Sequence, residues 1–209
     1  MLERVAFLRL LEPIEASGGR TLASLSEETD RIDALLAEQR SGAFSIDDAV
    51  DRFVQAHLLD RDPAWVERYK RYVLESVAAF VVPLPGWDRL HKAIHEARIP
   101  YALLTNGWNP LQLRKAECIG FGGPVVASAD IGAQKPDARA FEELTQVLGV
   151  PAEDIWYVGD NPIADVEGAL SAGMRGIWLD AESGRYPDTL LPPSETIHSL
   201  SELASRLTR

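Results

Sequence analysis

The sequence predicts an α/β fold, with a parallel β-sheet covered by helices and a separate α-helical domain. From about residue 14 to 82 the apolar residues recur at helical spacing, and no convincing strand interrupts them. From residue 83 onward short apolar runs alternate with amphipathic helices, as in βαβ units. Three of these runs end in polar residues, which places candidate functional groups at the carboxyl ends of parallel strands.

The helical segment contains three predicted helices. Apolar residues from Leu22 to Leu36 form the first, and Ser41-Gly42 supplies its stop. Ser45 begins the second with a capping-box pattern. The third has Asp62 as its cap and Pro63 at its first helical position. We expect these helices to form a small module.

Trp65, Tyr69 and Tyr72 lie at helical spacing in the third helix. This spacing favours a role in the core or in an interface over contact with a substrate.

The second segment supplies the sheet. Short apolar runs followed by helical patterns predict a parallel sheet with helices on both faces. A loop over 183–194 precedes a short closing helix at 199–207. The predicted strands are 101–104, 125–127, 155–158 and 176–179, and the predicted helices are 87–97, 110–119, 138–148 and 162–172.

Composition excludes several classes of function. The chain has 32 Asp and Glu against 21 Lys and Arg, a net charge of −11, so nucleic acid is a poor partner. The one cysteine, Cys118, cannot form an internal disulfide, which suits a reducing cytoplasm. No apolar run reaches the roughly 20 residues of a membrane span, and no signal-peptide pattern is evident. We therefore expect a cytoplasmic protein.

Polar residues at three strand ends are suited to an anion and a metal ion. Thr105-Asn106-Gly107 follows a buried strand in a turn that can hold a phosphate. Lys135 stands just ahead of a helix that Asp137 can cap. Asp160 and Asp165 flank a strand-to-helix turn and offer oxygen ligands of the kind that Mg²⁺ prefers. Each pattern alone is also an ordinary turn or helix start, but the three together in this order favour a site.

On these motifs the chain resembles the haloacid dehalogenase superfamily, most of whose members are phosphatases. The resemblance runs from about Pro85 to Leu179, through Leu104-Thr105-Asn106-Gly107, Lys135-Pro136-Asp137 and Val158-Gly159-Asp160 with Asp165. It implies a Rossmann-like core of residues 1–13 plus 83–209, with residues 14–82 as an inserted helical cap.

The resemblance also implies roles for the motif residues. Thr105 and the Asn106 N–H would hold phosphoryl oxygens, Lys135 would stabilise the phosphate, and Asp160 and Asp165 would organise Mg²⁺.

The family's first motif, a strand ending in two aspartates, is missing. The best candidate for that strand is Val5–Leu11, which places Leu8 at the nucleophile and Leu10 at the acid/base. Neither leucine can attack, donate a proton or bind a metal. Glu12 and Glu15 are the nearest carboxylates, but their spacing suits a helix face better than a strand end. No catalytic residue is therefore predicted, and Mg²⁺ binding should be weak or absent.

Two functions remain open. One is a hydrolase of small phosphorylated metabolites that is catalytically impaired or uses an unrecognised nucleophile. The other is a pseudoenzyme that binds an anion or a protein partner. If the site holds no metal or nucleophile, we expect Lys135 to pair with Asp160 or Asp165. Dehalogenation is disfavoured because it also requires the attacking aspartate.

Two other patterns have weaker readings. His91 and His95 lie four residues apart, as a helical metal pair would, but no third ligand is evident in the sequence and an exposed helix surface is the favoured reading. Cys118 lies in an amphipathic helix and reads as a half-buried packing residue.

Overall fold

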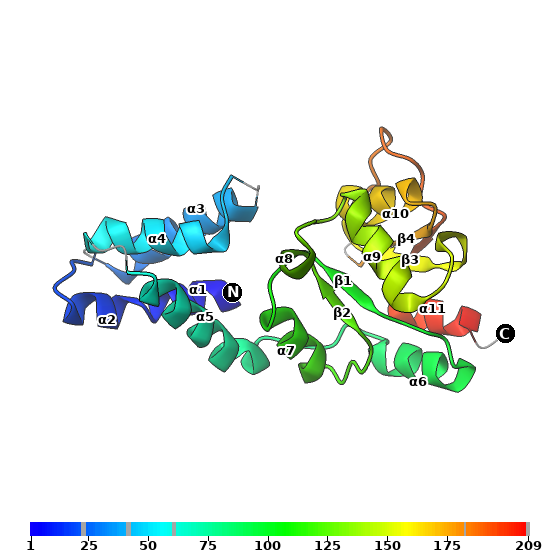
Figure 1. Ribbon diagram of the computed structural model, residues 1–209, viewed down its shortest axis with the longest axis horizontal. Helices are drawn as coiled ribbons and strands as arrows, with labels where there is room; N and C mark the ends of the chain where they lie inside the picture. Colours follow the sequence, from blue (N-terminus) through cyan, green and yellow to red (C-terminus); the bar gives the residue numbers. More distant parts are fainter. Residues whose placement is uncertain (22–23, 41–42, 60–61, 182, 208–209) are drawn as a thin grey trace. The chain divides into compact units, whose positions relative to one another are not determined.

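The computed structural model describes residues 1–21, 24–40, 43–59, 62–181 and 183–207. It divides into two compact units, Met1–Val81 and Val82–Arg209, which we call the helical unit and the α/β unit (Figure 1). Leu22 and the predicted stop at Ser41-Gly42 lie outside the described residues.

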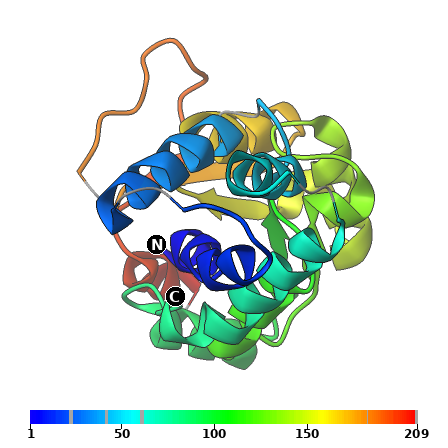
Figure 2. The same ribbon diagram turned by 90° about the vertical axis from the view of Figure 1, so that its left-hand side faces the viewer.

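The helical unit is built from short helices connected by turns (Figure 2). Its elements are α1 (Leu2–Leu8), α2 (Leu11–Ala16), α3 (Leu25–Arg40), α4 (Ile46–His57), α5 (Ala64–Ser76) and the 3₁₀ turn η1 (Val77–Ala79). The predicted capping box is present, because the Ser45 hydroxyl accepts from the Asp48 N–H while the Asp48 side chain accepts from the Ser45 N–H. The predicted starts of α4 and α5 are therefore confirmed within one or two residues.

The predicted strand over Val5–Leu11 is wrong. Residues 2–8 form helix α1, which packs against α3 and α5, and residues 11–16 form α2. Leu10 is fully buried within the helical unit and Leu8 is half-buried in α1. A short apolar run has no periodicity of its own that separates strand from helix, so tertiary contacts decided its form. Residues 1–13 consequently lie in the helical unit and not with residues 83–209.

Aromatic side chains fill the core of the helical unit. Phe7 packs against Phe53 and Tyr69, with ring centroids 5.1 and 4.6 Å apart. Trp65 and Tyr69 are buried, which confirms them as core residues. Tyr72 is half-buried, and the Arg9 guanidinium lies 4.0 Å from the centre of its ring.

The α/β unit follows the predicted alternation. All four predicted strands are present, with bounds that shift by at most two residues, and the predicted helices are present except that the one over 162–172 divides into a π-helical turn and a short α-helix. The strands are β1 (Leu103–Thr105), β2 (Val125–Ala127), β3 (Trp156–Gly159), β4 (Arg175–Leu179) and β5 (Glu195–Ile197), and the helices are α6 (Trp87–Ala97), α7 (Leu111–Cys118), α8 (Ser128–Ile131), α9 (Ala138–Leu148), α10 (Gly168–Ser171) and α11 (Leu200–Leu207), with η2 (Ala152–Asp154) and the π-helical turn η3 (Pro162–Glu167).

The strands form two parallel sheets, with β1 paired to β2 and with β3, β4 and β5 paired in that order. In the part of the chain that the structure describes, no strand pairs with the second edge of β1 or with that of β3. The two sheets nevertheless share a core, because Leu104, Phe141 and Tyr157 belong to one buried cluster. A hydrogen bond from the Tyr157 hydroxyl to the Leu104 carbonyl, 3.4 Å long, links β3 to β1 directly.

In the α/β unit, sequence reasoning missed one strand and one α-helix. The last strand, β5, pairs with β4, and α8 follows β2 immediately. Both are too short to show a period in the sequence. Across the described ranges no helix is long and apolar enough to cross a membrane.

Candidate active site

The candidate site lies where β1 and β3 end and where the loop before α9 approaches them. Asn106 follows β1, and its side-chain amide binds the Lys135 backbone twice. The Asn106 Nδ2 donates to the Lys135 carbonyl at 3.0 Å, and the Lys135 N–H donates to Asn106 Oδ1 at 2.8 Å. This two-point contact fixes the lysine loop against the end of β1. The sequence predicted Asn106 through its N–H, whereas the structure shows that its side chain has a positioning role.

Lys135 pairs with Asp165, one of the two carboxylates predicted for it. Its Nζ lies 2.5 Å from Asp165 Oδ1, and the two side chains are only 11% and 7% exposed. A charge pair with so little exposure to water depends on each partner, since removal of one leaves the other charge uncompensated.

Asp165 receives further donors that the sequence did not reveal. The Asn161 N–H donates to Asp165 Oδ2 at 3.0 Å, and the Tyr157 hydroxyl shares its one proton between Asp165 Oδ1 and the Leu104 carbonyl, each 3.4 Å away. Gly159 makes this approach possible, because a Cβ there would lie 2.4 Å from Asp165 Cγ. Both oxygens of the carboxylate are therefore engaged by the protein.

Burial raises the pKa of the Tyr157 hydroxyl well above its usual range, and the neighbouring Asp165 charge adds to the effect. Tyr157 therefore stays a neutral donor throughout the physiological pH range. The ammonium of Lys135 lies 5.7 Å from the centre of the Tyr157 ring, so the tyrosine contacts both members of the ion pair. A buried tyrosine within a strand gives no sequence signal that separates this role from packing.

The Thr105 turn is held by local hydrogen bonds. The Thr105 hydroxyl donates to Gln112 Oε1 at 3.3 Å. The Gly107 N–H donates to Ser128 Oγ at 2.9 Å, so this backbone donor is already used. Thr105 itself is half-buried and Asn106 is exposed, which leaves this edge open to a ligand.

Asp160 follows β3 directly, and its side chain is exposed. The Trp178 indole N–H donates to its backbone carbonyl at 3.0 Å, which fixes the backbone and leaves the carboxylate facing water. Because both Asp165 oxygens are engaged, Asp160 is the more available of the two predicted Mg²⁺ ligands. Among the described residues, no group of three or more His, Cys, Asp or Glu side chains is placed to hold a metal ion.

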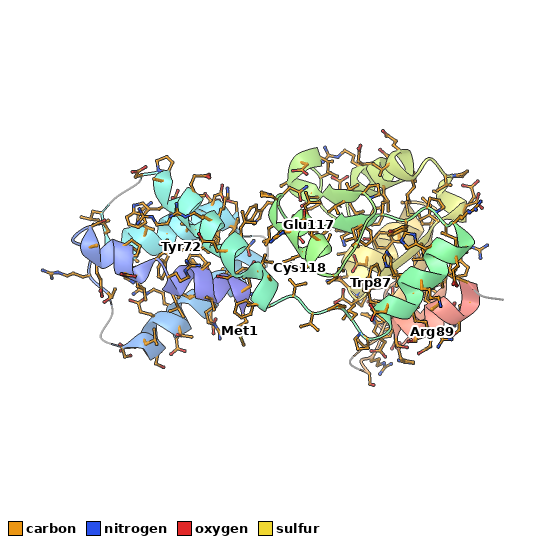
Figure 3. All side chains as sticks on the ribbon, turned by 90° about the horizontal axis from the view of Figure 1, so that it is seen from below. Met1, Tyr72, Trp87, Arg89, Glu117 and Cys118 are labelled. Atoms are coloured by element: carbon orange, nitrogen blue, oxygen red, sulfur yellow. The ribbon has the colours of Figure 1, made fainter. Side chains whose placement is uncertain are left out.

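The residues named as possible substitutes lie elsewhere in the chain. Glu12 and Glu15 are exposed on α2 in the helical unit, and Glu15 accepts a hydrogen bond from Thr21. Cys118 ends α7 and is half-buried, as expected for a packing residue (Figure 3).

Comparison with known proteins supports the likeness seen in the motifs. Residues 14–173, most of the chain, match the family described as haloacid dehalogenase-like hydrolase. The chain belongs to this family. The match to haloacid dehalogenase-like hydrolases begins within α2, so α1 lies outside it.

Two curated relatives are named as a nucleotidase and a phosphatase. The chain is 30% identical over 159 residues to the pyrimidine 5'-nucleotidase YjjG of Escherichia coli, which covers 70% of this chain and 69% of that protein. It is 43% identical over 102 residues to phosphoserine phosphatase of Thermus thermophilus. This match covers 46% of this chain and 41% of that protein. The match to the second relative therefore spans less than half of its length.

Solved structures share the fold. The magnesium-bound HAD-hydrolase YfnB from Bacillus subtilis has a TM-score of 0.67 at 23% identity, covering 100% of this chain and 92% of that one. A 2-haloacid dehalogenase from Pseudomonas syringae has a TM-score of 0.69 at 24% identity, covering 99% and 90%. At these identities the likeness establishes the α/β haloacid dehalogenase-like fold.

Proposed function

We propose that the chain binds small phosphorylated metabolites, or inorganic phosphate, at the cluster of Thr105, Asn106 and Lys135, and that it hydrolyses them poorly. The observation that carries the proposal is the placement of Lys135. Its backbone is held at the end of β1 by the Asn106 side chain, and its ammonium pairs with Asp165 beyond the end of β3. An ammonium beside an open strand end is a favourable place for a phosphate.

Binding an anion requires Lys135 to share its charge with the ligand. Asp165 can tolerate this, because the Asn161 N–H and the Tyr157 hydroxyl continue to donate to it. The lysine keeps its backbone position through Asn106, so only its side chain has to turn. The ligand therefore replaces part of an ion pair and does not require the loop to refold.

The proposal of poor hydrolysis rests on the absence of a second placed carboxylate. Leu8 and Leu10, which were expected at the catalytic positions, belong to the helical unit, so the strand expected to carry them is not formed by residues 5–11. The described polar contacts of Lys135 involve one carboxylate, that of Asp165, and the protein engages both of its oxygens. A carboxylate neutralised in this way is a weak nucleophile.

The residues fit a magnesium ion only in part. Asp160 offers an exposed carboxylate, whereas Asp165 is tied to Lys135 and Asn161. Mg²⁺ holds its waters strongly and commonly binds through one or two carboxylates together with substrate phosphates. We therefore propose weak Mg²⁺ binding that involves Asp160 and strengthens when a phosphate is present. When bound, the ion would neutralise negative charge on the phosphate.

A second candidate is an active phosphatase that uses Asp160. It is supported by the name of the E. coli relative, a pyrimidine 5'-nucleotidase, and by the exposure of the Asp160 carboxylate. Pyrimidine nucleotides therefore belong in any substrate screen, together with phosphoserine.

Titration calorimetry with inorganic phosphate tests binding. We expect the unmodified chain to bind and Lys135→Met to lose most of its affinity. Lys92→Met is the matched control, because Lys92 is 75% exposed and lies on α6. Equal phosphate affinity in Lys135→Met and Lys92→Met would refute the site.

A hydrolysis screen with Mg²⁺ at high protein concentration tests impairment. We expect turnover at or near background for nucleotides, phosphoserine and simple aryl phosphates. Robust turnover that Asp160→Asn abolishes and that Lys92→Met retains would overturn the proposed impairment and favour the active phosphatase.

A further inference from the structure

A second polar cluster lies at the amino-terminal end of β1, on the side away from Thr105. It consists of His91 and His95 on α6 and Tyr101, which lies two residues before β1. The His91 and His95 Nε2 atoms are 2.9 Å apart. The Tyr101 hydroxyl oxygen lies 3.2 Å from His95 Nε2 and 3.3 Å from His91 Nε2. Three donor atoms thus form a nearly regular triangle.

The protons available in this triangle cannot satisfy all three contacts. A neutral imidazole carries one N–H, and two Nε2–H groups 2.9 Å apart would oppose each other. One histidine must therefore have an Nε2 atom without a proton. At most two protons, the Nε2–H of the other histidine and the Tyr101 O–H, then remain for the three contacts. At least one pair of electronegative atoms faces without a proton between them. A cation in the triangle would satisfy all three lone pairs together.

The size of the triangle fits a first-row transition metal. Sides of 2.9, 3.2 and 3.3 Å define a circle of about 1.8 Å radius through the three atoms. A point about 1 Å above that plane is then about 2.1 Å from each atom, the usual metal distance for imidazole nitrogen and for oxygen. The side chains need little movement to serve as three ligands.

Aromatic packing holds the rings in place. The Trp87 ring stacks on His91 at a centroid distance of 4.8 Å, and its indole N–H donates to the Ile119 carbonyl. Phe121 packs against both Trp87 and Tyr101, at 5.9 and 5.0 Å. Ligands oriented in advance lose less conformational freedom on binding.

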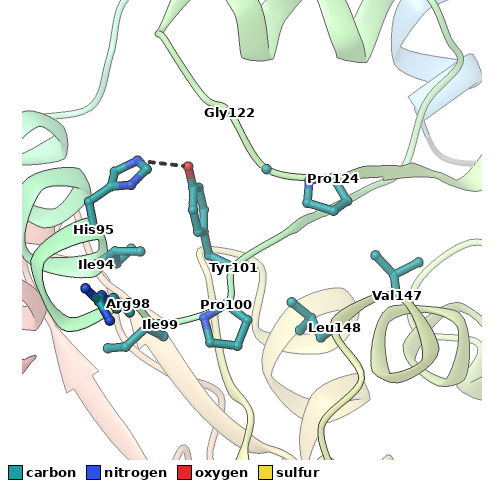
Figure 4. Close-up of a pocket in the computed structure, with 11 residues that line it drawn as sticks. Ile94, His95, Arg98, Ile99, Pro100, Tyr101, Gly122, Pro124, Val147 and Leu148 are labelled. Carbon is teal, nitrogen blue, oxygen red and sulfur yellow. Dashed lines mark hydrogen bonds between the residues drawn. The ribbon is translucent and has the colours of Figure 1, made fainter.

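The cluster is accessible from a surface pocket of about 480 Å³ (Figure 4). His95 and Tyr101 line the pocket together with Arg98, Pro100 and Pro124, and the hydrogen bond between His95 and Tyr101 faces it. His95 is exposed, so an ion and its remaining water ligands can reach the triangle.

We propose that His91, His95 and Tyr101 form a binding site for a divalent transition metal such as Zn²⁺. Imidazole nitrogen suits Zn²⁺ and its neighbours, whereas Mg²⁺ prefers oxygen ligands, so this site is chemically different from the one near Asp160. A bound ion would join α6 to the start of β1 and would leave further coordination positions to water.

Titration calorimetry tests the site, with Zn²⁺ as the titrant and the protein in Mg²⁺-containing buffer at slightly alkaline pH. We expect one Zn²⁺ per chain. His95→Asn and His91→Asn should weaken binding by at least about ten-fold, since even partners outside the first coordination shell change metal affinity by about 10- to 100-fold. His198→Asn is the matched control, a mainly exposed histidine that contacts Asp180 and lies beyond β5. An equal loss in His198→Asn, or no Zn²⁺ binding by the unmodified chain, would refute the site.

Tyr101→Phe distinguishes a three-donor site from a simple histidine pair. The ring can still pack against Phe121, so folding should be retained, and a thermal melt checks this directly. Under the proposal this variant binds Zn²⁺ more weakly than the unmodified chain, and Zn²⁺ raises its melting temperature less. Unchanged Zn²⁺ affinity in Tyr101→Phe would overturn the assignment of three ligands.

Discussion

At the scale of single residues, the candidate active site is organised by hydrogen bonds to Lys135 and Asp165. Asn106 fixes the lysine backbone, Tyr157 joins β1 to the ion pair, and Gly159 makes room for the aspartate. These contacts explain why residues about 30 positions apart meet at one point. They also show that the Asp165 carboxylate has neutral donors besides Lys135, whereas the Lys135 ammonium has Asp165 as its hydrogen-bond partner.

Lys135→Met should destabilise the α/β unit by about 3 kcal/mol, because it leaves the nearly buried Asp165 carboxylate without its cation. Urea denaturation followed by tryptophan fluorescence measures the change. Adding Asp165→Asn to this variant should restore most of the free energy of unfolding but not the phosphate affinity. Recovery of both, or of neither, would contradict this account of the pair.

Tyr157 should make stability fall in alkaline solution. The folded pKa of its hydroxyl is raised by burial, so above about pH 10 the unfolded chain loses this proton while the folded chain keeps it. The free energy of unfolding therefore decreases as pH rises beyond that point. In Tyr157→Phe, the difference between the denaturation midpoints at about pH 8 and about pH 11 should be smaller than in the unmodified chain. The substitution itself should lower the free energy of unfolding by about 1 kcal/mol at neutral pH.

At the scale of elements, local sequence signals and tertiary contacts act together. Ser45 and Asp48 begin α4 by hydrogen bonds within one turn. Gly86 begins α6 with φ of +88°, and its Cα faces Ser201 at the start of α11. The start of α4 therefore depends on neighbouring residues, whereas the start of α6 depends on contact with a helix more than a hundred positions away.

Ser45→Ala should destabilise the helical unit by about 1 kcal/mol, because the Asp48 N–H loses its acceptor. Ser26→Ala, on the exposed side of α3, is the matched control and should change the free energy of unfolding by less than about 0.5 kcal/mol. Chemical denaturation measures both. Equal effects would show that the capping box adds nothing to the unit.

The Asp48 carboxylate gives this cap a pH dependence. Hydrogen bonds from the Ser45 side chain and backbone hold its pKa below the usual range. The stabilisation is therefore complete above the unfolded pKa of about 4 and is lost as pH falls through the lowered folded value. In Asp48→Asn this acid-dependent component should be absent from the denaturation midpoints.

Gly86→Ala should destabilise the α/β unit more than Gly149→Ala does. Both glycines have positive φ, so each alanine bears a backbone cost of about 1 kcal/mol. A Cβ at Gly86 would also lie 2.4 Å from Ser201 Oγ and 2.5 Å from its backbone nitrogen, whereas a Cβ at Gly149 meets no atom within 4 Å. Melting temperatures of the two variants separate the cost of steric contact from the cost of backbone strain. Equal shifts would show that the approach of Ser201 adds nothing to the cost of Gly86→Ala.

At the scale of the whole molecule, the chain consists of two units with their own cores. Phe7, Phe53 and Tyr69 fill the first, whereas Leu104, Phe141 and Tyr157 share a cluster in the second. The segment that follows the helical unit has exposed apolar side chains at Val82 and Leu84. Units with separate cores joined by exposed chain are separable in experiment.

Limited proteinase K digestion of the native chain should cut first in the segment around Val82 and Leu84, which are 81% and 52% exposed. Mass spectrometry should find two fragments that meet at this segment. Early cleavage inside α3, α4 or α9 would contradict the division into two units.

The sequence alone determined most of the α/β unit. The alternation of apolar runs and helices located β1 to β4, and the turns after them located Lys135, Asp160 and Asp165, because strand ends and helix starts have local chemical requirements. The predicted pairing of Lys135 with a carboxylate followed from charge and is met by Asp165. Leucine spacing and capping residues likewise located the helices over 25–40, 46–57 and 64–76.

Only the tertiary structure decided the form of residues 5–11, the strand β5 and the roles of Asn106, Tyr157 and Tyr101. The apolar run Val5–Leu11 suits a strand or a helix equally, and packing of α1 against α3 and α5 selected the helix. The side-chain amide of Asn106 and the hydroxyl of Tyr101 act on groups that are distant along the chain or on another element. Such contacts depend on how the folded backbone brings distant residues together. The spacing of residues in the sequence does not indicate them, because it reflects only near neighbours.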